Sequence, residues 1–266
     1  MNAKKTDLVL FHSKNKTVTS RLTIKIKGTK FFLFNFVKYL GILIDSKLNW
    51  KIHISELTKK LHRATAILSK VRHYVSKPTL KSLYFSLFQS HLNYGCLVWG
   101  FAQKSLVNKI LRIQKRAIRL ITFSDYKCNT SRLFRELSIL KINDHILLCR
   151  YEFVHDWIHS RLPKTFDNIF VKKPPTIYNI RRNHSKVTVP TRRLETWGTN
   201  SLRYQGSLLH NSLVDLGLHN IQSKRIVKNK IKSMLLSYYV WKVNVFLACL
   251  QGSLLFSKLE QCFSFC

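Results

Sequence analysis

The spacing of apolar residues after residue 50 constrains the fold more than any other feature of this sequence. These residues recur alternately every three and four positions, and they are Ile54, Leu57, Leu61, Ala64, Leu68 and Val71. An α-helix has about 3.6 residues per turn, so this spacing places all of them on one helical face. We predict an amphipathic helix over roughly residues 51–74, with that face buried against the rest of the molecule.

Further apolar-periodic stretches predict more helices along the chain. Pro78 suits the first turn of the next one, because proline lacks the N–H that the first turn leaves unused. The Asn93–Gly95 segment is expected to end or bend that helix. The predicted ranges are 78–93, 106–121, 131–137, 143–160 and 223–239.

Before residue 50 the pattern is that of strands. Short apolar or β-branched runs are separated by turn-forming residues, which indicates a small antiparallel sheet or a pair of hairpins. The runs are Leu8–Phe11, Leu22–Ile26, Phe31–Phe34 and Tyr39–Ile44. We therefore predict a mainly α fold with a small N-terminal antiparallel β element, which makes the fold class α+β.

Charge indicates the kind of partner. Lys and Arg total 46 against 12 Asp and Glu, a formal net charge of +34. A compact domain with this charge repels itself, and the phosphates of RNA or DNA would neutralise it. An anionic membrane surface is the weaker alternative, because membrane-targeting basic clusters usually sit beside a lipid anchor or a spanning helix and neither is evident. The most apolar stretch, Val243–Phe256, is shorter than the roughly 20 residues that a span needs. We expect an RNA or DNA backbone as partner, and no membrane.

The basic residues of the predicted helix 106–121 are arranged on one side. Lys109, Arg112, Arg116 and Arg119 recur at i, i+3, i+7 and i+10, opposite the apolar residues of that helix. No acidic residue occurs between Glu56 and Asp125 to pair with them nearby. Phosphate contact is therefore predicted, with an ordinary solvated helix face as the alternative. The predicted contact residues are Lys109, Arg112, Lys115, Arg116 and Arg119.

The cysteines predict neither disulfides nor a metal site. The six cysteines show no paired framework and no CxxC spacing, which favours reduced thiols in an intracellular protein, nuclear or cytoplasmic. Cys262 and Cys266 lack the neighbouring Cys and His that tetrahedral zinc ligation requires. Serine, histidine and aspartate are scattered without a nucleophile motif, so hydrolase chemistry has no support.

Several stretches, taken in order, together carry a family resemblance. They are Asn2–Phe11, Val37–Asp45 with Leu48–Trp50 and His53, Leu92–Gly95 through Val98–Gly100, and Ile113–Arg119. This series resembles LINE-type (non-LTR) retrotransposon reverse transcriptases, in the region just past their active-site turn. The matches cover about residues 2–239.

The resemblance implies a partial reverse-transcriptase palm followed by a helical thumb. Residues 1–50 would hold residual palm strands and a primer-grip-like hairpin, and residues 51–162 a helical thumb-like domain. Residues 163–239 would form a basic C-terminal region with a helix. Residues 240–266 abruptly lose charge, and composition leaves open whether they are a foreign or frame-altered tail or an extra docking helix.

The resemblance also implies roles for single residues. Lys5 would lie near the phosphates of the incoming nucleotide; the alternative is a surface lysine beside a strand. Tyr39, Leu40 and Gly41 would form a hairpin that supports the primer terminus, with Gly41 allowing close approach of the nucleic acid. The alternative there is a strand with a glycine bulge.

Two departures from the family pattern limit what we expect of this chain. The family holds two metal ions with an aspartate and an adjacent Asp-Asp pair, and this chain has no adjacent Asp pair. His210-Asn211 also replaces the usual Trp-Asn. We expect Mg²⁺ to serve the intact family enzyme, but no cofactor in this chain and no catalytic residue.

The predicted function follows from these departures. The chain would be a fragment of an RNA-directed DNA polymerase that binds template–primer nucleic acid but lacks the catalytic aspartates, so that it is inactive alone. The alternatives are a non-catalytic nucleic-acid-binding protein and a retroelement remnant without a function.

Overall fold

The apolar periodicity after residue 50 produces the longest helices of the first half. In the computed structural model, which describes residues 6–13, 23–26, 29–173, 185–191, 198 and 200–248, the first helix is α1 (Lys51–Val71). Its predicted apolar face is buried as far as Leu68, with Val71 half-buried at the end, and the helix packs along α5 (Lys104–Thr122). At the end of α1 the Arg72 guanidinium lies 4.6 Å from the ring centroid of Phe123, just after α5. The two helices therefore run in the same direction.

The N-terminal strands form two separate antiparallel hairpins. Strand β1 (Thr23–Ile26) pairs with β2 (Thr29–Phe32), and β3 (Phe36–Tyr39) pairs with β4 (Ile42–Asp45). The predicted pair of hairpins is thus confirmed, and with it the α+β fold class.

Two of the predicted strand ranges are wrong. The run Tyr39–Ile44 is not one strand, because Leu40 and Gly41 form a two-residue turn between β3 and β4. Their φ angles are 44° and 80°, the positive values that a type I′ hairpin turn requires. In the run Leu8–Phe11 only Leu8 pairs, through a single parallel bridge to Leu33.

The helix predicted from Pro78 is present but interrupted. It consists of α2 (Lys77–Tyr84), a π-helical turn (Phe85–Gln89) and α3 (Ser90–Asn93). A four-residue helix, α4 (Cys96–Trp99), follows and was not predicted. Gly95 precedes α4 with a φ of 61° and marks the bend expected at this point.

A buried glutamine joins the two halves of the helical core. Gln114 of α5 is 0% exposed. Its side-chain amide donates to the Tyr84 hydroxyl and to the Leu140 carbonyl, each at 3.0 Å. Its carbonyl oxygen accepts the backbone N–H of Ile142 at 2.9 Å. One side chain therefore holds α2, α5 and the start of the next long helix together.

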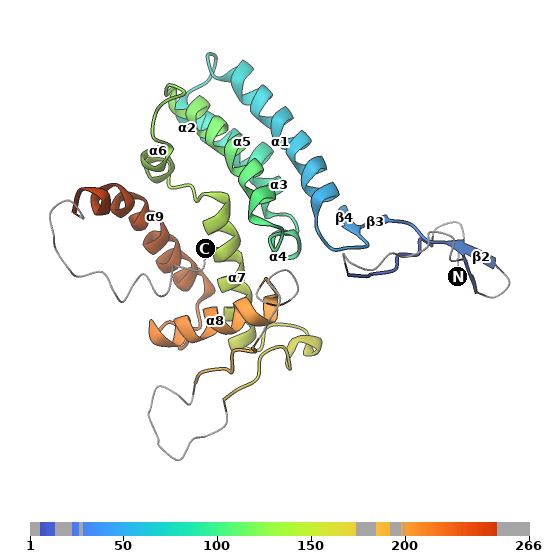
Figure 1. Cartoon of the computed structure of the whole chain (residues 1–266). Helices are drawn as coiled ribbons and strands as arrows, with labels where there is room; N and C mark the ends of the chain where they lie inside the picture. Colours follow the sequence, from blue (N-terminus) through green and yellow to red (C-terminus); the bar gives the residue numbers. More distant parts are fainter. Residues whose placement is uncertain are drawn as a thin grey trace.

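The second half of the chain is built around α7 (Ile142–Ile158). The other elements there are α6 (Thr130–Glu136), a 3-10 turn (Lys164–Phe166), α8 (Leu202–Asp215) and α9 (Lys224–Ala248). Helix α7 contacts α5, α8 and α9, and it leads from the first group of helices to the last two (Figure 1). The predictions for α6, α7 and α9 are confirmed, whereas α8 was missed.

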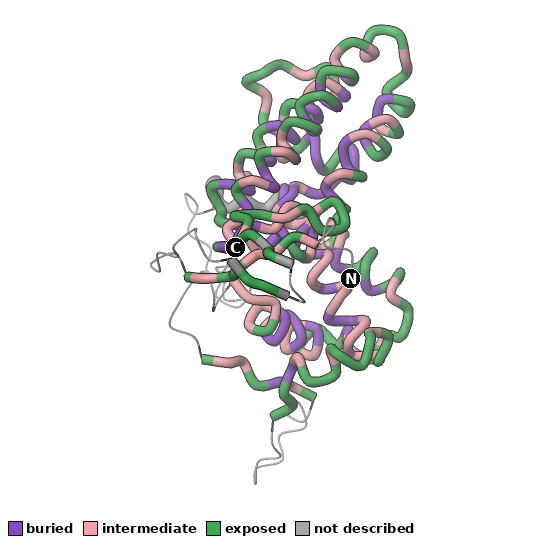
Figure 2. The backbone as a smooth tube through the Cα atoms, turned by 90° about the vertical axis from the view of Figure 1, so that its right-hand side faces the viewer, coloured by how far each residue is buried: buried purple, intermediate pink, exposed green. Residues whose placement is uncertain are grey.

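Ion pairs fix α9 on α7. The Lys224 ammonium lies 2.5 Å from the Asp156 carboxylate, and that of Lys228 lies 2.8 Å from Glu152. Helix α9 continues past the predicted end to Ala248, and the rest of the apolar tail lies outside the described residues. None of the described helices combines the length and apolarity needed to cross a membrane. Figure 2 shows the buried residues on the facing sides of the helices. The described side chains of β1, β2 and β3 are mostly exposed, whereas those of β4, which packs on α1, are half-buried or buried.

Candidate nucleic-acid interface

The β3–β4 hairpin is fixed to α1 by one buried carboxylate. Asp45, at the end of β4, accepts the backbone N–H of Asn49 at 3.0 Å with one oxygen and that of Trp50 at 2.9 Å with the other. Leu48 and Trp50 have φ angles of 48° and 63°, a region that leucine and tryptophan seldom adopt. The spacing of Asp45, Leu48 and Trp50 therefore matches a tight turn into α1, in which the Asp45 carboxylate bonds the backbone just before the helix.

The tip of the same hairpin contacts a second stretch of the family pattern. The Tyr94 hydroxyl donates to the carbonyl of Leu40 in the turn. The indole N–H of Trp99 in turn donates to the Tyr94 carbonyl at 2.8 Å. A Cβ atom on Gly95 would lie 2.5 Å from the Cδ1 atom of Ile42, so glycine allows this close approach. Two motifs that are far apart in the sequence thus form one contact.

A pocket of about 480 Å³ opens beside the turn, between the hairpin, α1 and the end of α3. Its lining is rich in side chains that can carry positive charge. Those side chains are Lys38, His53, Lys60 and His91. Glu56 also lines the pocket, and its carboxylate is paired with Lys59 at 2.6 Å.

The surroundings of both pocket histidines favour their neutral form. Burial, with the charge of Lys60 as a second cause, lowers the pKa of His53 and also that of His91. The Nδ1 atom of His53 accepts the backbone N–H of Leu43 at 3.3 Å, which only an unprotonated nitrogen can do. The imidazole of His53 therefore ties β4 to α1 only while it is neutral.

This arrangement predicts a loss of stability in mild acid. Because the pKa of His53 in the folded chain lies below its unfolded value of 6.5, the unfolded state binds the proton first. The stabilisation is complete above pH of about 6.5 and is lost as the pH falls toward the folded pKa. We expect His53→Gln, which keeps an acceptor but cannot titrate, to lose less stability than the wild type on acidification.

The measurement is the free energy of urea unfolding at a series of pH values from about 7.5 to 5.5, a range that brackets the unfolded histidine pKa. His62→Gln, a change at an exposed histidine of the same helix, serves as the control and should follow the wild type. Parallel pH profiles for the wild type and His53→Gln would contradict the assignment.

The basic residues of α5 lie on the side opposite its buried face. Ile110, Ala117 and Ile121 are fully buried, as predicted. On the opposite side Lys109, Arg112 and Arg116 are exposed and Lys115 is half-buried. We call these four cationic residues, Lys109, Arg112, Lys115 and Arg116, the basic face of α5.

Arg119 is placed differently from the residues of the basic face. It is half-buried, and its guanidinium donates to the Cys128 carbonyl at 3.2 Å. The guanidinium carbon also lies 5.3 Å from the ring centroid of Tyr126. Arg119 thus holds the loop after α5 in place.

Acidic residues are used elsewhere in the fold. The ion-paired carboxylates of the described chain belong to Glu56, Glu136, Glu152, Asp156 and Asp215. Within the part of the chain that the structure describes, no ion pair reaches any residue of the basic face. Its positive charge is therefore not neutralised by the protein.

The described site residues that were predicted fall into two groups, one on the β3–β4 hairpin and one on α5. Tyr39 and Leu40 are 64% and 72% exposed at the tip of the β3–β4 hairpin, and Gly41 completes the turn. The basic face lies on α5, and both β4 and α5 pack on α1. Lys5 lies outside the described residues. The pocket residues Lys60 and His91 were not predicted, since neither stands in a recognisable motif.

Among the described residues, one group of three side chains could hold a metal ion, namely Cys96, His145 and Cys149. A hydrogen bond from Cys96 lowers the pKa of the Cys149 thiol, while the same contact and burial raise the pKa of Cys96. This sulfur and nitrogen set does not fit Mg²⁺, which takes oxygen ligands. The described residues contain no comparable cluster of carboxylates.

Comparison with known proteins gives three relatives from Drosophila melanogaster. The chain is 27% identical to the probable RNA-directed DNA polymerase from transposon X-element over 158 residues, which are 58% of this chain and 17% of that protein. It is 31% identical to the RNA-directed DNA polymerase from mobile element jockey over 112 residues, 41% of this chain and 12% of that protein. It is 30% identical to the probable RNA-directed DNA polymerase from transposon BS over 112 residues, which are 41% of this chain and 12% of that protein.

These relatives indicate a region of a retrotransposon RNA-directed DNA polymerase, and the predicted resemblance to the non-LTR elements is confirmed. The matched part spans less than a fifth of each relative's length. No family model matches the chain. No solved structure matches it either.

Proposed function

We propose that the basic face of α5 binds the sugar–phosphate backbone of a template–primer duplex. The observation that carries this proposal is the combination of a fully buried face and an opposite face of cations without acidic partners on one helix. Burial of Ile110 and Ala117 fixes the rotation of α5 about its own axis, so the cations on the opposite side face the solvent. Such a surface favours a polyanion over an uncharged partner.

The dimensions of the basic face suit contact with a nucleic-acid strand. From Lys109 to Arg116 the helix axis advances about 10 Å at 1.5 Å per residue. That length corresponds to roughly three nucleotides of one strand of a duplex at 3.4 Å each. Contacts of this kind place a protein on a duplex without reading its bases. The region would therefore recognise shape and charge rather than sequence.

The hairpin tip provides a second contact in this proposal. Tyr39 presents an exposed aromatic ring that can stack on a base or lie against a sugar. Next to it, Lys38 and Lys60 line the pocket and can meet phosphates. The hydrogen bond from Tyr94 to Leu40 holds the turn in place, so the tip is presented in one orientation. This supports the predicted role of Tyr39, Leu40 and Gly41 at a primer strand.

The proposal assigns binding, and not nucleotide addition, to this region. Two-metal phosphoryl transfer needs several carboxylates close together. Among the described residues, Asp and Glu side chains form no group of three that could hold a metal ion. Glu152 and Asp156, which lie one turn apart on α7, are ion-paired with Lys228 and Lys224 of α9. In a complete polymerase this region would keep the duplex in position while carboxylates elsewhere in the protein hold Mg²⁺.

A charge-removal variant tests the proposal. Replacing Lys109, Arg112 and Arg116 with glutamine should weaken binding to an RNA–DNA duplex by about 10- to 100-fold near physiological salt. The slope of log Kd against log salt concentration should also fall by about 2 to 3, because each lost phosphate contact no longer releases a counterion. Fluorescence anisotropy over a salt series measures both quantities. Arg119 is left unchanged, since it supports the loop after α5.

A matched variant controls for net charge. Arg203, Arg225 and Lys230 are exposed cations of α8 and α9, and their replacement with glutamine removes the same charge from another part of the surface. This control should keep the salt slope close to that of the wild type. If both variants lose affinity and slope equally, the basic face is not a specific contact and the proposal fails.

A further inference from the structure

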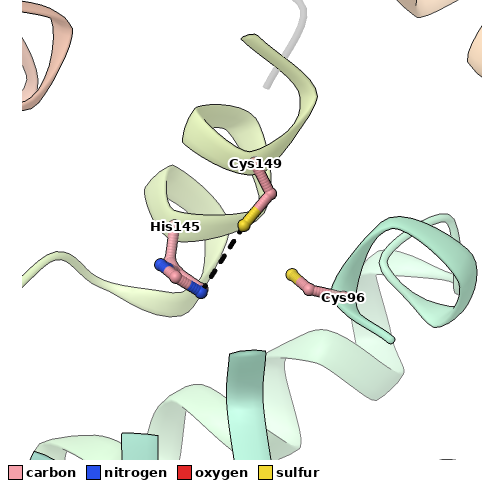
Figure 3. Close-up of side chains that lie close together, drawn as sticks. All are labelled: Cys96, His145 and Cys149. Atoms are coloured by element: carbon pink, nitrogen blue, oxygen red, sulfur yellow. Dashed lines mark hydrogen bonds between the residues drawn. The ribbon is translucent and has the colours of Figure 1, made fainter. Parts of the chain in front are cut away.

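Two cysteines and a histidine from distant parts of the sequence meet between α4 and α7. Cys96 begins α4, whereas His145 and Cys149 lie one turn apart on α7 (Figure 3). The sulfur and nitrogen atoms of the three side chains all lie within 4.8 Å of one another. Cys96 is buried and the other two are half-buried. The group lies outside the hairpin and the basic face, and the proposed function does not use it.

We propose that Cys96, His145 and Cys149 bind a thiophilic divalent cation of the Zn²⁺ class. A tetrahedral ion with Zn–S bonds of about 2.3 Å and Zn–N bonds of about 2.0 Å places a sulfur and a nitrogen ligand roughly 3.6 Å apart. The Cys149 sulfur and the His145 Nε2 atom are 3.6 Å apart in the structure. This pair already stands at the separation that such an ion requires, and the Cys96 sulfur lies within 4.8 Å of both atoms.

The helices are shaped to bring these ligands together. An i, i+4 spacing places His145 and Cys149 on the same face of α7. Gly100, at the end of α4, allows the close approach to that face, because a Cβ atom there would lie 2.9 Å from a methyl carbon of Ile146 on α7. The approach is thus built into the local sequence.

The chemistry of the ligand set selects the class of ion. Two thiolates and a neutral imidazole balance a charge of +2, and sulfur ligands favour Zn²⁺ over Mg²⁺ or Ca²⁺. No fourth side chain joins the group within the described residues. The fourth position would therefore belong to water, which the half-buried setting of His145 and Cys149 admits.

Bound there, the ion would join two parts of the molecule. Helix α4 carries Trp99, whose indole N–H holds Tyr94 against the hairpin turn. Helix α7 packs against α8 and α9. A metal link from Cys96 to His145 and Cys149 would thus connect the hairpin side to the C-terminal helices, which is a structural role and not a catalytic one.

Cobalt binding to the reduced full-length chain tests the site. Co²⁺ should bind with the near-ultraviolet charge-transfer absorption of cobalt–thiolate bonds and the visible bands of a tetrahedral ion, and Zn²⁺ should displace it. Cys149→Ser should lose these bands and weaken binding by more than about 100-fold, since even the partners that only orient metal ligands contribute 10- to 100-fold. His145→Gln, at a half-buried position, should weaken binding in the same way. Cys128→Ser, a change at a free cysteine in the loop before α6, should keep both spectrum and affinity.

A thermal measurement provides a second readout. Zn²⁺ should raise the melting temperature of the wild type and of Cys128→Ser but not that of Cys149→Ser, because only a native site stabilises the folded state. Circular dichroism in the absence of metal checks that each variant is folded. An unchanged cobalt spectrum in both Cys149→Ser and His145→Gln would place the ion elsewhere. Absence of thiolate bands in the reduced wild type, with only a Cys96–Cys149 disulfide forming on oxidation, would also overturn the proposal.

Discussion

Replacing Gln114 with leucine is expected to lower the free energy of unfolding by about 3 to 5 kcal/mol, since each buried polar group left without a partner costs about 1 to 3 kcal/mol. The side chain is fully buried, and it satisfies the Ile142 N–H and the Leu140 carbonyl. Leucine has a similar volume but no polar atom, so both backbone groups would lose their partner. The Tyr84 hydroxyl keeps its hydrogen bond to Gln89 at 3.1 Å.

Urea unfolding followed by circular dichroism measures this loss. Gln103→Leu is the matched control, because Gln103 is exposed immediately before the same helix and makes no side-chain capping bond. Its effect should stay within about 0.5 kcal/mol. A loss below about 1 kcal/mol for Gln114→Leu would mean that water or a local shift satisfies the two backbone groups.

Replacing Trp99 with alanine is expected to cost a similar amount, about 3 to 5 kcal/mol, which is typical of a large aromatic side chain removed from a core. Trp99 is 0% exposed in the short helix α4. Its ring lies 6.2 Å from that of His53 on α1. Its indole N–H holds the Tyr94 carbonyl, so the loss should loosen the hairpin turn as well as the core.

Two further variants separate packing from hydrogen bonding at this position. Trp99→Phe keeps an aromatic ring but removes the N–H. The lost hydrogen bond should lower the free energy of unfolding by about 1 kcal/mol, in addition to the effect of the smaller ring. Tyr74→Ala, at an aromatic residue that is 87% exposed, should change stability little. If Trp99→Phe were as damaging as Trp99→Ala in urea unfolding, the hydrogen bond rather than the packing would dominate.

The long amphipathic helices were predictable because their buried residues are apolar and recur every three or four positions. Helices α1, α5 and α7 appear close to their predicted bounds for this reason. Helix α4 is too short to show a period. Helix α8 was missed because its buried face includes Gly206, Ser207 and His210, which do not look like a core in the sequence.

The hairpin shows what sequence patterns cannot specify. Gly41 indicated a bulge or a close approach, but the turn also requires a positive φ at Leu40, which leucine seldom adopts. That conformation is maintained by the bond from Tyr94, a residue 54 positions away. A single sequence does not show such a pairing, although both residues stand in the stretches that carried the family resemblance.

The candidate sites also differ in how far the sequence could predict them. The basic face of α5 could be derived from helical angles alone, because all of its members lie on one helix. Arg119 has a suitable angle, yet the loop that ends at Cys128 engages it, and that loop has no periodic signal. Cys96 and His145 carry no metal-binding spacing in the sequence, since their proximity depends on how α4 packs against α7.

The paired use of both Asp45 oxygens has a consequence for how a duplex could be accommodated. This carboxylate locks the entry into α1, and α1 packs along α5, so α1 joins the hairpin to the helix that carries the basic face. In the proposed complex, this connection would limit how far the hairpin tip and the basic face can move apart. A duplex that touches both would need a width that matches the distance between the hairpin tip and the basic face. The fold could therefore favour one duplex geometry over another without contacting the bases.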